Sequence, residues 1–299
     1  MKYEPLSLFE FQKRFKDEKS CLKALEKMRW PNGFECPQCH HDHAYKLVDR
    51  RVHQCARCGH QASLTAGTIF HKTRTPLQKW FWAIYLVSQD KGGVAALRLS
   101  KQLDLGYKTA WLMLHKIRTA MGNRDARYQL QGLVEVDDAF FGGVRAGKAG
   151  RGADNKTPVV VMIESRGEHA GYLSMKSVSQ VSGEEIENVI EQKIIEGATI
   201  KTDGYSSYKG LPQIGYQHHG EKVPPKEASI KLPWVHIAIS NAKRFLLGTY
   251  HGVSHKHLMR YLDEYCYRFN RRWHEKDMTS HLIAACIYAK PVTYAELTG

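Results

Sequence analysis

The chain has 299 residues, and its 42% hydrophobic and 25% charged content is typical of a globular protein with a substantial core. Its 44 Lys and Arg against 30 Asp and Glu give a net charge of +14, which favours a polyanionic partner, nucleic acid before a membrane surface. No apolar run approaches the ~18 residues of a membrane span and residues 1–5 lack a signal-peptide core, so we expect a cytoplasmic protein whose seven cysteines are metal ligands or buried thiols.

The first 33 residues carry a helical pattern. Apolar side chains recur at helical spacing from Leu6 to Met28, and a Pro-Asn-Gly sequence at residues 31–33 predicts the end of the helices. We expect residues 1–33 to form a helical segment that leads into the next region.

Two Cys-x-x-Cys pairs define the second region, residues 34–72. The pairs are Cys36 with Cys39 and Cys55 with Cys58, and 15 residues separate them. This spacing predicts a zinc ribbon, in which a short hairpin brings four thiolates around one tetrahedral Zn²⁺. Because so small a unit gains most of its folding free energy from the metal, the zinc is expected to be structural.

Residues 73–123 follow the order of a helix-turn-helix region. Helical patterns at 94–103 and 108–118 flank a Gly-containing turn, and the second helix is rich in basic side chains. On this interpretation five side chains of the second helix face DNA: Lys108, Thr109, His115, Lys116 and Arg118. The alternative is a helical hairpin that only packs against its neighbours.

Two strand-like segments each end in an aspartate. Residues 133–143 place Asp137 after an apolar run, and residues 198–205 do the same for Asp203. A carboxylate held at the end of a buried strand suits a hard divalent cation, which prefers fixed oxygen ligands. We therefore expect Asp137 and Asp203 to lie on adjacent strands and to share metal ions, with Asp138 pointing to the opposite face. The alternative is that the aspartates only close turns.

Residues 130–290 are expected to form the third domain. Apolar strands at 158–164 and 171–176 follow the first aspartate strand, and a capped helix at 182–196 precedes the second. Such an order of strands, helix, strand and further helices is that of a mixed sheet resembling ribonuclease H. The expected fold class is α/β (α+β), with a ribonuclease H-like domain preceded by a zinc ribbon and a helix-turn-helix region.

The chain as a whole resembles the DDE-type insertion-sequence transposases, in the bacterial group named after insertion sequence 1595. Besides the zinc ribbon, the resemblance lies in five blocks: 135–143, 202–205, 243–253, 257–265 and 268–272. It implies catalysis with two Mg²⁺ or Mn²⁺ ions held by Asp137, Asp203 and a third residue. It also implies DNA partners (terminal inverted repeats and target DNA), a homodimer or larger synaptic assembly, and association with the bacterial nucleoid.

The third active-site residue, usually Glu in such enzymes, has two candidates. Asn241 is favoured, because members of the resembled family can carry Asn there with a Lys shortly after it, and Lys243 follows here. His236 is the other, since it lies seven positions, or two helical turns, before Lys243 and would share its face. Lys243 and Arg244 are expected to contact phosphates. The alternative is a decayed site that binds no metal.

These features together predict an enzyme that recognises inverted repeats, nicks each end by hydrolysis and joins the 3′-hydroxyl to target DNA. Two alternatives stay open. One is a DNA-binding protein without catalysis, such as a repressor or a domesticated transposase. The other is a ribonuclease H-like nuclease that keeps the metal chemistry and lacks strand transfer.

Overall fold

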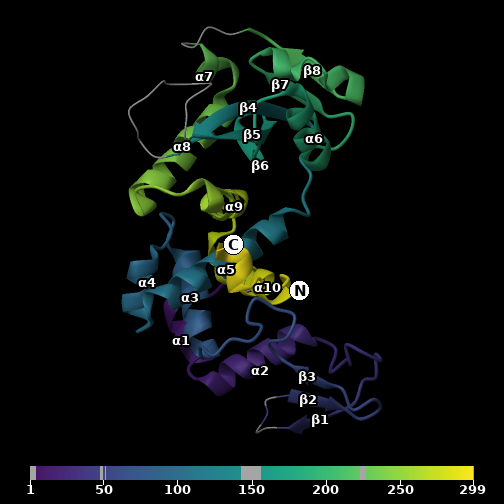
Figure 1. Cartoon of the computed structure of the whole chain (residues 1–299), viewed down its shortest axis with the longest axis vertical. Coiled ribbons are helices and arrows are strands. Elements are labelled where there is room, and N and C mark those ends of the chain that lie inside the picture. The colour runs from purple at the N-terminus through teal and green to yellow at the C-terminus, as the bar shows by residue number, and fades with distance from the viewer. Residues whose placement is uncertain (1–4, 48–49, 51, 143–155, 223–226, 299) are drawn as a thin grey trace. The chain divides into compact units, whose positions relative to one another are not determined.

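The computed structural model describes residues 5–47, 50, 52–142, 156–222 and 227–298, which form two compact units (Figure 1). One unit comprises residues 1–124 and 274–299, and the other comprises residues 125–273. The sequence placed the end of the last domain at 290, whereas the second unit ends at Trp273. The reason is that helix α10 packs on α3 in the first unit, where Thr279 Oγ1 lies 2.7 Å from Ser88 Oγ.

The first unit contains the amino-terminal helices, a three-stranded ribbon and the helical region. The two amino-terminal helices each begin with a capping box, at Ser7 and at Asp17, so their first backbone N–H groups are satisfied locally. The helices of this unit are α1 (Leu8–Arg14), α2 (Glu18–Arg29), α3 (Leu77–Gln89), α4 (Ala96–Gln102), α5 (Tyr107–Asp125), η3 (Glu275–Asp277), α10 (Met278–Tyr288) and α11 (Tyr294–Thr298). Strands β1 (Ala44–Leu47), β2 (Val52–Cys55) and β3 (Gln61–Ser63) pair antiparallel in chain order.

A five-stranded mixed sheet forms the centre of the second unit. Its strand order is β6-β5-β4-β7-β8, with β4, β5 and β6 antiparallel and with β4, β7 and β8 parallel. The strands are β4 (Leu133–Phe141), β5 (Thr157–Arg166), β6 (His169–Ser177), β7 (Thr199–Thr202) and β8 (Gln217–Gly220). The helices are α6 (Gly183–Lys193), η1 (Ser206–Tyr208), η2 (Leu211–Ile214), α7 (Ala228–Lys231), α8 (Pro233–Tyr250) and α9 (His255–Asn270).

Helices cover both faces of this sheet. Alternate residues of β4 enter two separate cores: Ala139 and Phe141 pack with α8 and α9, whereas Val134 and Val136 pack with α6. A mixed sheet of this order with helices on both faces is ribonuclease H-like, so the expected fold class is confirmed. Strand β8 is an addition that the sequence did not predict. None of the described helices is long and apolar enough to cross a membrane.

Candidate functional site

The ribbon brings the four cysteine thiols together. Their Sγ atoms all lie within 4.8 Å of one another, with 3.6 Å between Cys36 and Cys58 and 3.5 Å between Cys39 and Cys55. Tetrahedral zinc with Zn–S bonds of about 2.3 Å places its sulfur ligands roughly 3.8 Å apart. The donor set and spacing therefore fit a closed, structural Zn²⁺ site.

Both cysteine pairs sit in the same kind of tight turn. The Cys36 carbonyl accepts a hydrogen bond from the His40 N–H at 3.0 Å, and the Cys55 carbonyl accepts one from Gly59 at 3.0 Å. His40 and Gly59 are both left-handed, with φ of 58° and 70°, which turns the chain back after each pair. The two turns therefore aim their thiols at a common point.

The helical pair α4–α5 forms as predicted, but α5 presents a different face from the one expected. Of the side chains proposed to face DNA, Lys108 is exposed and Thr109 is half-buried at the start of α5. Three others are buried: His115, Lys116 and Arg118. Lys116 Nζ donates a hydrogen bond to the Ile69 carbonyl at 3.2 Å, and burial lowers the pKa of its amine. The expectation that these three residues face DNA is wrong, because all three side chains are buried in the middle of α5.

Asp137 lies in the middle of β4, and Asp203 directly follows the end of β7, the parallel neighbour of β4. The sequence predicted that the first strand ends at the aspartates, whereas β4 continues to Phe141 because its last residues pair with β5. Leu133 of β4 is level with Thr199 of β7 and Glu135 is level with Lys201, so the same register continued by two residues brings Asp137 level with Asp203. One oxygen of Asp137 accepts the Asp138 N–H at 2.8 Å, and one oxygen of Asp203 accepts the Tyr205 N–H at 3.0 Å. Each carboxylate is therefore oriented by backbone, as a metal ligand needs to be.

Asp138 points to the other face of the sheet. Its Oδ1 accepts a hydrogen bond from the Tyr208 hydroxyl at 3.5 Å, and Tyr208 belongs to the core on the α6 side. The alternation of β4 thus separates the two neighbouring carboxylates, as predicted.

His236 in the first turn of α8 lies close to both aspartates. Its Nε2 is 3.8 Å from Asp137 Oδ2, and the Asp203 carboxylate acts on its ring electrostatically. Burial lowers the pKa of His236, and the negative charge of Asp203 opposes that shift. A lowered pKa keeps the imidazole neutral near physiological pH, the form that can donate a lone pair to a metal.

The side chain of Asn241, the candidate favoured from sequence, lies on a different side of α8 from His236. It lies five positions after His236 on the helix, which places the two side chains roughly 140° apart around the axis. Its Oδ1 accepts a hydrogen bond from Arg244 Nη2 at 2.8 Å on the exposed side of α8. Lys243, two turns after His236, does lie near Asp137: burial and the charge of Lys156 lower the pKa of its amine, and Asp137 opposes them.

Glu135 is a site residue to which sequence analysis gave no role. It lies two positions before Asp137 on β4 and is 3% exposed, and its Oε2 accepts a hydrogen bond from the Val235 N–H at 3.0 Å. Burial raises the pKa of Glu135, while the N–H groups of Val235 and Trp234 act in the opposite direction. The cap residue of α8, Leu232, makes no side-chain cap, so this buried carboxylate caps the helix that carries His236. The available signal was a Glu between Val134 and Val136, in the apolar beginning of the strand.

The aspartate site is more open than the zinc site. Within the described part of the chain, the four cysteines are the one group of three or more His, Cys, Asp or Glu residues whose ligand atoms lie within 4.8 Å of one another. Adjacent ligands on one octahedral cation, with bonds of about 2.1 Å, stand roughly 3.0 Å apart, and opposite ligands stand roughly 4.2 Å apart. The 3.8 Å between Asp137 Oδ2 and His236 Nε2 falls between these two values.

Comparison with known proteins gives two family matches along the chain. Residues 129–270 match an ISXO2-like transposase domain, and residues 16–61 match a transposase zinc-ribbon domain. Both models describe transposases of insertion sequence 1595. A protein of Halobacterium salinarum, described as an uncharacterized protein in transposable element ISH50, is 26% identical over 223 residues, which is 67% of this chain and 72% of its own length.

Solved structures of the Mos1 transposition machinery show weak similarity. A pre-cleavage Mos1 transpososome is 13% identical, with 70% of this chain and 79% of that chain covered at a TM-score of 0.27. A Mos1 mariner paired end complex with Mn is 12% identical, with 70% and 78% covered at a TM-score of 0.28.

Proposed function

The chain belongs to the insertion sequence 1595 family of transposases, and from that premise we propose that it binds the terminal inverted repeats of its element and catalyses metal-dependent 3′-end nicking and strand transfer. The observation that carries the proposal is the convergence of Asp137 in the middle of β4, Asp203 directly after β7 and His236 at the start of α8. Backbone N–H groups orient both carboxylates, and a neutral imidazole lies 3.8 Å from one of them.

We assign the third active-site position to His236 in place of Asn241. His236 shares its helix face with Lys243, which lies near Asp137, whereas Asn241 points away and accepts a hydrogen bond from Arg244. Two carboxylates and one imidazole suit Mg²⁺ or Mn²⁺, and the imidazole favours Mn²⁺ of the two. When bound, such ions polarise the scissile phosphate and lower the pKa of the attacking water or 3′-hydroxyl.

The protein groups have distinct tasks in this proposal. Asp137, Asp203 and His236 would hold the ions, and the Lys243 ammonium would neutralise a non-bridging phosphate oxygen beside them. Water and then the DNA 3′-hydroxyl attack, so no protein nucleophile is required.

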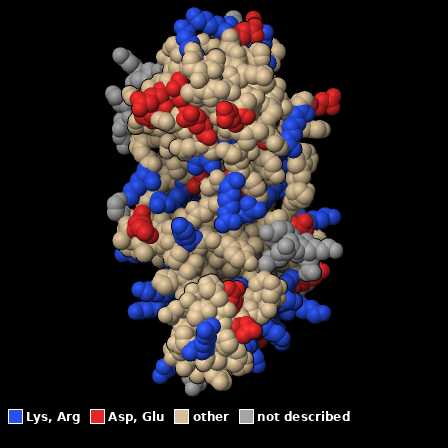
Figure 2. Space-filling model, turned by 90° about the vertical axis from the view of Figure 1, so that its right-hand side faces the viewer, with Lys and Arg blue, Asp and Glu red and all other residues tan. Residues whose placement is uncertain are grey.

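The two faces of the second unit differ in charge. Helix α6, on the side of that unit shown in Figure 2, carries four Glu among its 11 residues, and acidic side chains gather there. Helix α8, on the opposite face of the sheet, carries Lys243 and Arg244 and no acidic residue. This polarity favours approach of DNA from the α8 side. The zinc ribbon and Lys108 and Thr109 of the first unit are proposed to hold the inverted repeat, and a dimer or larger assembly is expected because two ends must be joined.

The test is a nicking and strand-transfer assay on a labelled duplex that carries the end of the element encoding this chain, in Mg²⁺ and in Mn²⁺. We expect Asp137→Ala, Asp203→Ala and His236→Ala to lose activity by about a thousandfold or more, the scale of removing a group that holds the transition-state charge. Asn241→Ala, on the same helix, is the matched control and should retain activity.

Each contrary outcome identifies a different error. Loss of activity in Asn241→Ala with activity kept in His236→Ala would reverse the assignment of the third residue. Binding of the duplex with no cleavage by the wild type in either metal would leave a DNA-binding protein without catalysis. Nicking without any joining to a second duplex would indicate a nuclease.

A further inference from the structure

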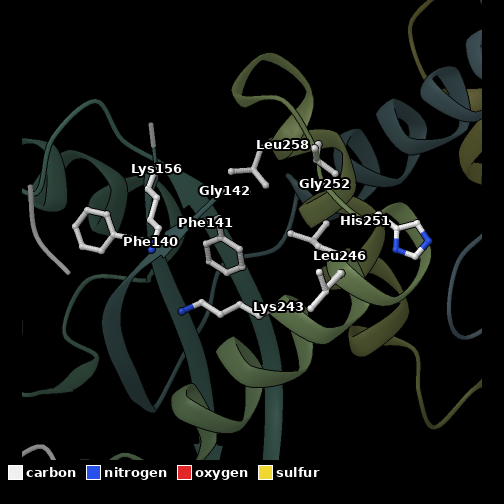
Figure 3. Close-up of a pocket in the computed structure, with 11 residues that line it drawn as sticks. Phe140, Phe141, Gly142, Lys156, Lys243, Leu246, His251, Gly252 and Leu258 are labelled. Atoms are coloured by element: carbon white, nitrogen blue, oxygen red, sulfur yellow. The ribbon is translucent and has the colours of Figure 1, made fainter. Parts of the chain in front are cut away.

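A pocket of about 310 Å³ opens next to the proposed catalytic site (Figure 3). It lies between the end of β4, the second half of α8 and the beginning of α9, all in the second unit. The residues that line it are Phe140, Phe141, Gly142, Lys156, Lys243, Leu246, Leu247, His251, Gly252, Val253 and Leu258. The catalytic proposal uses Lys243 alone among them.

The charge of this pocket selects an anion. Among the described lining residues none is acidic, while Lys156, Lys243 and His251 supply nitrogen donors. The amino ends of Lys156 and Lys243 point to the same region beside Phe140 and Phe141 (Figure 3), and the charge of Lys156 lowers the pKa of Lys243. Two ammonium groups that repel each other across a shared space are stabilised by an anion placed between them.

The other lining residues favour a ligand that also has a flat or apolar group. Leu246, Leu247 and Val253 form an apolar wall, and the half-buried ring of Phe140 lies beside Lys156 (Figure 3). A volume of about 310 Å³ is at the lower end of small-ligand sites, so it accommodates one base and its sugar and excludes a stacked base pair. An anion joined to one planar apolar group is the chemistry of a single nucleotide.

The pocket lies close to the place where the catalytic site would act on a DNA strand. Phe140 and Phe141 follow Asp137 and Asp138 on β4, and Lys243 lies near Asp137 while also lining the pocket. The phosphate that Lys243 would neutralise beside the carboxylates therefore borders the pocket, and the nucleotide attached to that phosphate is within reach of the pocket.

We propose that this pocket binds one unpaired nucleotide of the DNA strand next to the nick, with its base removed from the duplex stack. The proposal rests on the proposed function and adds to it a subsite for a flipped base. Extruding a base costs a few kcal/mol, least at a duplex end or nick, and stacking against an aromatic ring together with a phosphate contact offsets that cost.

The first experiment detects the flipped base. 2-Aminopurine, which fluoresces more strongly when unstacked, replaces each nucleotide that flanks the nick, one at a time, and binding is followed without divalent metal. We expect the 2-aminopurine fluorescence to rise at one position, called the bright position, when the full-length wild type binds. Leu247→Trp should abolish that rise, since Leu247 is 59% exposed and a larger side chain there fills the pocket without entering the core. Ile195→Trp, an exposed apolar residue of the same unit outside the lining, is the control and should behave as wild type.

The second experiment separates the pocket from general damage. Leu247→Trp should nick normal DNA about tenfold more slowly than wild type, the value of one stacked base, and should nick DNA with an abasic nucleotide at the bright position as fast as wild type does. Equal losses on both substrates, or no bright position while the wild type nicks normally, would overturn the subsite. Absence of nicking by the wild type would overturn the proposed function instead, and brightening that persists in Leu247→Trp would place the base elsewhere.

Discussion

The Oε2 atom of Glu135 lies 3.0 Å from the backbone nitrogen of Val235 and accepts its hydrogen bond inside the second unit. This contact joins the strand that carries Asp137 to the helix that carries His236, and both catalytic candidates are within two residues of it. Because Leu232 provides no side-chain cap, the Glu135 carboxylate stabilises the positive end of α8 and sets the position of its first turn.

Replacing Glu135 by Leu is expected to reduce the free energy of unfolding of the second unit by about 1–3 kcal/mol, because it leaves buried N–H groups of α8 without an acceptor. Glu135→Gln keeps an oxygen acceptor and should lose less. Urea unfolding measures both. At a temperature where Glu135→Leu is folded, Mn²⁺ binding should be weaker than in the wild type, since His236 is no longer held against Asp137. Unchanged Mn²⁺ affinity in the folded variant would show that Glu135 only stabilises the helix.

Lys108 and Lys116 lie two helical turns apart on α5 and should respond to substitution in opposite ways. Lys108 is exposed, so Lys108→Ala should weaken DNA binding and reduce the salt slope of log K by about 0.9 if it contacts one phosphate. Lys116 is buried and bonded to the Ile69 carbonyl, so Lys116→Met should change thermal stability and leave the salt slope unaltered. Fluorescence anisotropy at several salt concentrations, together with thermal melting, gives both quantities. An unchanged salt slope in Lys108→Ala would show that α5 does not belong to the DNA-binding surface.

The zinc ribbon should depend on its metal for folding. We expect about one Zn²⁺ per chain to be released by a strong chelator, and Cys36→Ser or Cys55→Ser to lose it. Hydrogen exchange should then accelerate in β1, β2 and β3 while the β4–β7 pair keeps its protection. Cys21→Ala is the matched control, because Cys21 is buried outside the thiol cluster and should leave the zinc content unchanged. Slow exchange in the ribbon after complete removal of zinc would contradict a metal-dependent fold.

Local spacing made part of this molecule predictable. The two cysteine pairs, the strand that carries Asp137 and the strand that precedes Asp203 depend on residues close in sequence and on a two-residue period. The choice between His236 and Asn241 depends instead on where α8 begins and how it is rotated, since each residue turns the helix by about 100°. The cap from Glu135, which lies 100 residues before Val235, contributes to that placement and leaves no local pattern.

Burial of charged side chains was the other failure of sequence reasoning. Lys116 and Arg118 were interpreted as exposed because charged residues are seldom fully buried. In the structure both are buried, and the Lys116 ammonium donates a hydrogen bond to a backbone carbonyl that lies 47 residues earlier. Such a partner is set by the tertiary fold, so the sequence of α5 alone does not indicate it.

Asp263 on α9 is expected to make the stability of the second unit depend on pH. Burial raises its pKa from 3.8 to about 6, with the like charge of Asp125 adding to the rise and with Lys176, Lys193 and Arg260 opposing it. The native state therefore binds a proton more tightly than the unfolded chain does. The stability that this proton contributes is complete below about pH 4 and is lost as the pH rises through about 6.

Removing that ionisation should reverse the loss. Asp263→Asn is expected to raise the free energy of unfolding at pH 7.5 by at most about 3 kcal/mol, the equivalent of the shift, and to change it little near pH 4. Urea titrations at the two pH values give the difference directly. Glu227→Gln, which alters an exposed carboxylate of the same unit, is the control and should leave the free energy of unfolding unchanged at both pH values. If Asp263→Asn destabilised the protein at pH 7.5, the ionised carboxylate would be stabilised by Lys176, Lys193 and Arg260 more than burial disfavours it, and the order of these effects would be reversed.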